Sequence, residues 1–226
     1  PTSNTEKLKN KRNTWVMSTT DDLQREVMNE QSEFLRNLSD EYSGSTNLLT
    51  KDNNLRIRAL PLKSSSTMAA FVFPFDKYNK MQICYNKKFF NQAQNEIYKN
   101  SKKNIDSGWH SHSDEENIVN HTIAHEYGHF VERTIVEKYK NNNPEEYSQF
   151  SDFDTYYKTK SKEICKKIYQ IKVEQLGDKT HDRVSEYAYD CYPENFAEIF
   201  ANLATSKKPT NWGNAMKIFL KEEKIC

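Results

Sequence analysis

The segment His125-Glu126-Tyr127-Gly128-His129 contains two imidazoles and one carboxylate at a spacing that suits a zinc hydrolase. On an α-helix, residues four apart lie one above the other on the same face, so His125 and His129 can bind one Zn²⁺ without bending the backbone. Glu126 would project beside that face, within reach of a water molecule on the metal. The alternative is a surface helix with two incidental histidines, because the pattern alone is only moderately specific.

The residues around this pattern predict one long helix over about residues 114–139. Ser113 precedes Glu116 by three residues, which is a capping-box spacing. Gly128 costs about 1 kcal/mol of helix propensity relative to Ala, and we expect that another backbone or a substrate approaches closely there. Apolar residues recur at intervals of three and four, which indicates one buried stripe: Ile118, Val119, Ile123, Ala124, Tyr127, Phe130, Val131 and Ile135.

A catalytic zinc ion takes three protein ligands and leaves a fourth position for water. A second predicted helix begins near Pro193, which suits a first turn, and carries Glu194 and Glu198 four residues apart on one face. We interpret Glu194 as the third ligand and Glu198 as an acceptor that orients one of the histidines. The alternative is a solvated acidic face. Glu132 is a weaker candidate because it lies on the same helix as the histidines and cannot easily close a tetrahedron.

Other histidines compete as ligands. His110 and His112 form a His-x-His pair just before the predicted zinc helix, and we expect them in a loop at the rim of the cleft, where they could touch substrate or a metal ion. His121 lies one turn before His125, but three stacked histidines rarely serve one tetrahedral site. His181 lies in a segment with the composition of a turn.

Taken together, these motifs resemble the zinc peptidase domain of the anthrax lethal-factor family, gluzincins that include the clostridial Pro-Pro endopeptidases. The resemblance covers about residues 105–205 and is clearest in His125–His129, Tyr187 and Glu194–Phe200. The chain departs from the family in the proline directly before Glu194 and in the linker 140–182, which does not align.

The resemblance implies that His125, His129 and Glu194 bind zinc and that Glu126 is the general base. It also implies that Tyr187, seven residues before Glu194, faces the metal. Zinc lowers the pKa of its water ligand from about 16 to around 7, and the glutamate would pass the proton of that water to the leaving amine. Tyr187 would donate a hydrogen bond to the oxyanion, with Tyr189 and Tyr192 as neighbouring alternatives.

Composition limits the choice of partner. The net charge of +1 gives no reason to expect nucleic acid, and no apolar run approaches the roughly 18 residues that a membrane span needs. The four cysteines, at positions 84, 165, 191 and 226, show no CxxC spacing that would indicate a structural zinc or redox motif. The chain starts at Pro1 without a Met, so we expect a processed form or a fragment of a larger polypeptide.

Periodicity and turn residues predict the remaining elements. Residues 1–14 are expected to be loose. The family resemblance implies that one edge strand lines the cleft, where an extended peptide could add as a further strand. The expected helices are 20–42, a short one opened by Pro144, 159–176 closed by Gly177, and 211–223 capped by Thr210; the expected strands are 55–60, 68–73 and 81–86, the last two joined by a turn near 76–80.

These observations predict an α+β fold, a zincin-like metallopeptidase domain that is mostly helical with a small mixed sheet. We divide the chain into an N-terminal polar segment and helix, residues 1–50, and a catalytic domain, residues 51–226. The expected function is a zinc endopeptidase with a protein or peptide substrate, secreted or delivered by a phage or toxin. The alternatives are a degenerate zincin-like binding module of a larger toxin, phage or surface protein, and a zinc hydrolase of a non-peptide amide. Retention of Glu126 argues against the binding module, which has no need of a general base.

Overall fold

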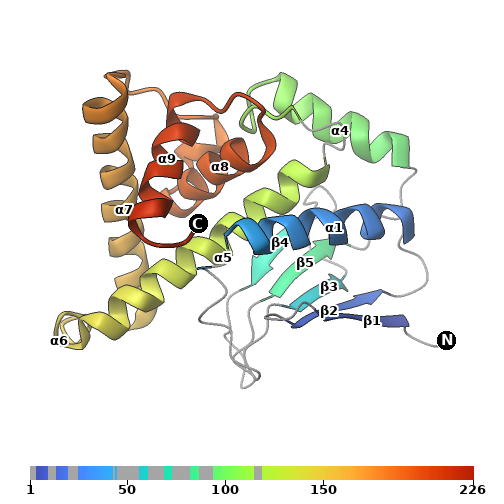
Figure 1. Ribbon diagram of the computed structural model, residues 1–226, viewed down its shortest axis with the longest axis horizontal. Helices are drawn as coiled ribbons and strands as arrows, with labels where there is room; N and C mark the ends of the chain where they lie inside the picture. The colour runs from blue at the N-terminus through green and yellow to red at the C-terminus, as the bar shows by residue number, and fades with distance from the viewer. Residues whose placement is uncertain are drawn as a thin grey trace.

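The structure of the protein, a computed structural model, describes residues 4–9, 14–19, 25–42, 44, 56–60, 69–72, 82–86, 94–114 and 119–226. It is mostly helical, as predicted (Figure 1). The helices are α1 (Arg25–Glu41), α4 (Gln94–Asp106), α5 (Val119–Asn142), α6 (Pro144–Tyr147), α7 (Phe153–Leu176), the 3₁₀ helix η1 (Tyr187–Tyr189), α8 (Tyr192–Thr205) and α9 (Asn211–Glu222). The strands are β1 (Asn4–Lys9), β2 (Thr14–Thr19), β3 (Arg56–Leu60), β4 (Ala69–Val72) and β5 (Gln82–Asn86).

The strands form a mixed sheet in the order β1-β2-β3-β5-β4. Strands β2, β3 and β5 run parallel to their neighbours in this series, whereas β1 and β4 pair antiparallel at the two edges. Strand β4 pairs with β5 in the register Ala69↔Tyr85, as the predicted hairpin requires, although the expected turn near 76–80 lies outside the described residues. The edge strand β4 also packs beside α5.

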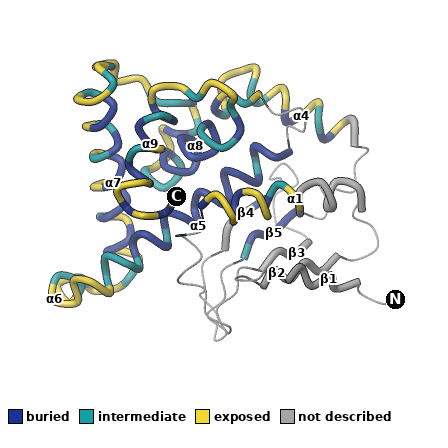
Figure 2. The backbone as a smooth tube through the Cα atoms, viewed as in Figure 1, coloured by how far each residue is buried: buried dark blue, intermediate teal, exposed yellow. Residues whose placement is uncertain are grey.

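Helix α5 runs through the middle of the molecule and is buried along most of its length (Figures 1 and 2). Its predicted apolar stripe is in the core, where Tyr127 and Phe130 are fully buried and pack with Phe200 of α8 or with each other. Helices α7 and α9 cover α8 in turn. Since α5 contacts both the sheet and α8, it is the element that joins the two parts of the core.

Several predicted helix ends are confirmed. Gly177 ends α7 in the left-handed conformation, with φ of 69°, and its N–H bonds to the carbonyl of Lys172. Thr210 caps α9 by accepting from the N–H of Gly213. Helix α7 begins at Phe153, earlier than the predicted 159, because Asp152 caps it by accepting from the N–H of Thr155.

The capping box predicted at the start of the zinc helix lies partly outside the described residues, which exclude Glu116. Asp114 is not helical, and Ser113 Oγ lies 3.4 Å from the carbonyl oxygen of Thr205, to which it donates. The cysteines at 84, 165, 191 and 226 are all free.

Strands β1 and β2 and helix α4 differ from the sequence prediction, which had no strand before residue 55. The prediction of a loose segment over residues 1–14 was wrong for Thr14, the first residue of β2, and for Asn4–Lys9, which forms the edge strand β1. Its polar, lysine-containing sequence hides the strand, but such residues are usual on exposed edges. Helix α4 was missed because few of its residues are apolar; among those whose burial is described, Ile97 is the apolar side chain that is fully buried.

The boundary at residue 50 stays a prediction; strands from both sides of it share the sheet. Among the residues that the structure describes, no helix combines the length and apolar character that crossing a membrane demands.

Candidate metal centre

Three side chains converge where α5 meets α8. Nε2 of His125 lies 3.0 Å from Oε2 of Glu194, and Nε2 of His129 lies 3.4 Å from the same oxygen. The two imidazole rings meet edge to face, with centroids 4.9 Å apart. The ligand atoms of His125, His129 and Glu194 all lie within 4.8 Å of one another. The structure therefore brings together the three residues that the sequence predicts as ligands.

The charge and bonding of Glu194 suit a cation between these side chains. Its Oε2 is buried and, among the described residues, has no hydrogen-bond partner despite facing two ring nitrogens. Burial raises the pKa of Glu194, but the imidazoles of His125 and His129 outweigh it and lower the pKa well below the usual range. A buried carboxylate oxygen without a hydrogen bond is costly unless something positive balances it. Two imidazoles and one carboxylate are also the donor set of catalytic zinc sites.

Gly128 allows the two helices to come this close. A Cβ at Gly128 would lie 3.0 Å from Cα of Ala197 and 3.1 Å from Cβ of Phe200, both on α8. The expectation of a close backbone approach at Gly128 is therefore confirmed, and the approaching backbone is that of α8. Helix α8 begins with Tyr192 and Pro193 in its first turn, so Glu194 lies near its N-terminal end, facing the two histidines.

Glu198 lies one turn further along α8 and accepts a hydrogen bond from Nδ1 of His125, the ring nitrogen that does not face Glu194. Its Oε1 is 2.8 Å from Nδ1 of His125, and its side chain is completely buried. Because a carboxylate can only accept, Nδ1 of His125 carries a proton, and Nε2, which faces Glu194, is the ring nitrogen that could bind a metal. Burial lowers the pKa of His125, but Glu194 and Glu198 together raise it well above the usual range. Both carboxylates thus favour positive charge at this position.

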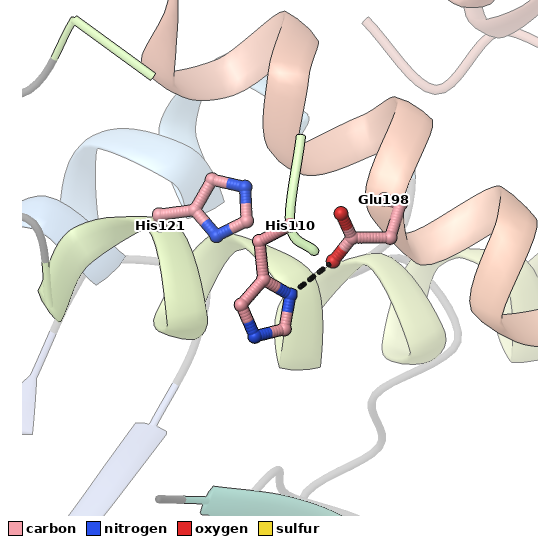
Figure 3. A group of neighbouring side chains, drawn as sticks. All are labelled: His110, His121 and Glu198. Atoms are coloured by element: carbon pink, nitrogen blue, oxygen red, sulfur yellow. Dashed lines mark hydrogen bonds and ion pairs between the residues drawn. The ribbon is translucent and has the colours of Figure 1, made fainter. Parts of the chain in front are cut away.

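A second group of possible ligands lies beside the first and contains His110, His121 and Glu198 (Figure 3). Nδ1 of His110 is 3.0 Å from Oε1 of Glu198, and the N–H of Ser111 donates to Oε2 at 2.6 Å. Nε2 of His121 is 2.9 Å from Ser111 Oγ. In contrast with Glu194, both oxygens of Glu198 accept hydrogen bonds from the protein. The second group is therefore a hydrogen-bonded support for the first.

Tyr187 stacks on His125, one of the candidate ligands. Its ring lies 5.6 Å from that of His125 at an interplanar angle of 28°. Burial raises the pKa of Tyr187 well above its usual value, and the nearby carboxylates of Glu194 and Glu126 add to this effect. The phenol therefore keeps its proton at neutral pH and can act as a hydrogen-bond donor.

Glu126 follows His125 on α5 and is buried. Burial raises the pKa of Tyr85 on β5, and the charge of Glu126 raises it further; the same charge contributes to the raised pKa of Tyr187. A carboxylate whose charge acts on both tyrosines lies near both of them. The residue predicted as the general base is therefore close to Tyr187, which stacks on His125.

The other sequence candidates lie elsewhere. Glu132 is fully buried, each of its oxygens accepts a hydrogen bond from α7 (Tyr157 and Ser161, both at 2.5 Å), and it belongs to no ligand group among the described residues. His112 is exposed and pairs with Asp114 at 3.0 Å. His181 stacks on Tyr169 at the surface, with ring centroids 5.3 Å apart. Neither of these two histidines belongs to a ligand group among the described residues.

Sequence reasoning missed Ser111 and the shared role of His110 and His121. All three belong to the support around Glu198, which depends on the loop between α4 and α5 folding back onto α8. The position of His121, one turn before His125, was the one available signal.

Comparisons with protein-family models, with curated proteins and with solved structures found no match for this chain.

Proposed function

We propose that this chain is a zinc-dependent endopeptidase with a zincin-like fold of the gluzincin type, which hydrolyses peptide bonds of a protein substrate. The observation that carries the proposal is the convergence of Nε2 of His125 and Nε2 of His129 on Oε2 of Glu194, within 3.0 and 3.4 Å. The oxygen without a hydrogen bond, among the described residues, gives zinc a third ligand.

Zinc, when bound, supplies a water of lowered pKa, about 7, and polarises the carbonyl of the scissile bond. Glu126 removes a proton from the attacking water and delivers it to the leaving amine. The phenol of Tyr187, protonated because burial and nearby carboxylates raise its pKa, donates a hydrogen bond to the developing oxyanion. Glu198 fixes the His125 ring through its Nδ1, at 2.8 Å.

The position of β4 supports a peptide substrate over a small amide. Among the described strands, β4 is an edge of the sheet, and it packs beside α5, the helix that carries His125, Glu126 and His129. An edge strand offers unpaired backbone groups, to which an extended peptide can add as a further strand. A substrate bound there would run alongside the zinc helix, with a peptide bond presented to the metal centre.

Two measurements on one pair of proteins test the proposal: zinc content and cleavage of a peptide library by the wild type and by Glu126→Gln. We expect about one zinc per chain in both proteins, and cleavage by the wild type that falls by roughly 10²–10⁴-fold in the variant. Stoichiometric zinc without any cleavage by the wild type would instead identify a zincin-like binding module. Cleavage of non-peptide amides alone would identify the other hydrolase.

A further inference from the structure

The loop Ser107–His112 between α4 and α5 forms hydrogen bonds with two parts of the candidate metal centre, the segment Glu186–Tyr187 and the side chain of Glu198. The carbonyl oxygens of Gly108 and Trp109 accept from the N–H groups of Glu186 and Tyr187, each at 3.0 Å. Gly108 has a φ of 78°, a left-handed conformation that turns the chain out of α4. The same loop therefore holds the backbone of Tyr187 and, two residues later, reaches Glu198.

His110 and His125 donate to the same carboxylate oxygen. Oε1 of Glu198 is 3.0 Å from Nδ1 of His110 and 2.8 Å from Nδ1 of His125, while Oε2 accepts from the N–H of Ser111 at 2.6 Å. Three donors from two elements thus fix the plane of one carboxylate. Among the described residues, Glu198 is the hydrogen-bond partner of Nδ1 of His125, so the orientation of this ring depends on the plane of the Glu198 carboxylate.

The protons in this network can be assigned by counting. Ser111 Oγ has one proton and lies 2.9 Å from the carbonyl oxygen of Glu198, which can only accept. Ser111 Oγ must therefore accept from Nε2–H of His121, 2.9 Å away. This requires no charge on His121, in agreement with burial, which lowers the pKa of His121 to about 3. These hydrogen bonds account for the protons of Ser111 Oγ and His121 Nε2 without a cation among His110, His121 and Glu198.

We propose that His110 is a positioning residue of the metal centre: by holding the carboxylate of Glu198, it fixes the ring of His125 and strengthens zinc binding. This inference rests on the proposed function, because it presumes zinc at His125. The Glu198 side chain is fully buried, whereas that of His110 is 21% exposed. A change at His110 therefore removes one donor from a buried anion without opening a cavity in the core.

The test compares two complementary variants for zinc affinity, measured by competition with a chelator. His110→Phe keeps a ring but has no donor, and we expect it to bind zinc about 10–100-fold more weakly. His110→Asn lacks the ring but places an amide N–H where Nδ1 was, and we expect it to retain most of the wild-type affinity. His112→Leu, in the same loop but paired only with exposed Asp114, is the control and should bind as the wild type does.

The melting temperature of each zinc-free variant separates loss of donor from loss of fold. A role in folding alone would lower this temperature and leave the affinities of the folded variants equal. Equal zinc affinity in the wild type and His110→Phe would overturn the inference while leaving the proposed function intact. Two zinc ions per wild-type chain, one of them lost in His110→Phe, would also overturn it, since His110 would then be a ligand. Absence of zinc binding by the wild type would refute the proposed function itself.

Discussion

Tyr187 is within ring contact of His125, and its hydroxyl is the donor that the proposed reaction needs for its oxyanion. Tyr187→Phe keeps the stacked ring and removes only this donor. We expect kcat to fall by about 10²–10³-fold with little change in KM, because the hydrogen bond strengthens only as negative charge develops. Peptide cleavage under saturating substrate measures this loss.

Tyr189 provides the matched control for Tyr187. It lies on the same 3₁₀ helix and is 59% exposed, so Tyr189→Phe should leave kcat unchanged. A fall in kcat of equal size in both variants would mean that η1 affects the reaction through its packing and not through the hydroxyl of Tyr187. Weaker zinc binding by Tyr187→Phe would likewise contradict a role limited to the oxyanion.

Glu132 is a fully buried carboxyl that the proposed reaction does not use, and it should make stability depend on pH. Burial raises its pKa to about 7, outweighing the hydrogen bonds from Ser161 and Tyr157 that lower it; the usual value is 4.5. Between these two pH values, the folded state binds more protons than the unfolded state, so stability falls as pH rises. The slope from this group is at most about 1.4 kcal/mol per pH unit.

Glu132→Gln cannot lose a proton and should lack this part of the pH dependence. Urea unfolding of both proteins at about pH 5 and about pH 8 measures it, since other titrating groups cancel in the comparison. The wild type should lose more stability than Glu132→Gln over that interval. Parallel profiles would show that Glu132 is ionised throughout.

At the scale of single residues, the sequence was sufficient to predict which side chains of the candidate site share one face of a helix. Helical spacing by itself places His125 and His129 on one face, and it places Glu194 and Glu198 on one face of another helix. What spacing cannot predict is which elements lie against those faces. The assignment of Ser111 and His110 to Glu198 depends on a loop that is 87 or 88 residues away in sequence.

Helices α5 and α8 form the framework of the site, and their separation is set at Gly128. Gly128→Ala improves helix propensity by about 1 kcal/mol, but the new Cβ would lie 3.0 Å from Cα of Ala197. Overpacking of this kind costs about 1–3 kcal/mol. We therefore expect a lower free energy of unfolding and weaker zinc binding, because α8 carries Glu194 and must shift.

Asn141→Ala, at an exposed position near the end of the same helix, is the control for helix propensity and should not destabilise the protein. Urea unfolding and chelator competition on both variants provide the comparison. An increase in stability for Gly128→Ala would show that the two helices can separate freely.

Elements with a buried stripe were predictable and elements at the surface were not. Helix α5 was predictable because apolar residues recur along it and sixteen of its residues are buried. Helix α4 has few apolar residues, and β1 is a polar edge strand among the described strands, so neither has the long apolar series from which an element is predicted.

For the whole molecule, zinc should act as a stabilising ligand. The proposed ligands come from α5 and α8, which are adjacent in the fold but separated in the chain by α6, α7 and η1. A ligand that binds only the folded state adds about 2.7 kcal/mol at a free concentration 100 times its Kd. We expect zinc to raise the melting temperature, EDTA to reverse the rise, and Glu194→Ala to lose most of it. An unchanged melting temperature on chelation would contradict this expectation.

The arrangement of the molecule follows from the central position of α5, which contacts the sheet through β4 and the helical part through α8. The α-rich character and the pairing of the last two strands were predictable from local patterns. The order of the strands was not, because the parallel pairing of β2 with β3 and of β3 with β5 joins segments that are distant in sequence.

The most direct measurement is anomalous diffraction at the zinc edge from crystals of the zinc-loaded protein. The account predicts one peak, about 2.0–2.2 Å from Nε2 of His125, Nε2 of His129 and a carboxylate oxygen of Glu194. A peak between His110, His121 and Glu198, or no peak beside His125 and His129, would contradict it.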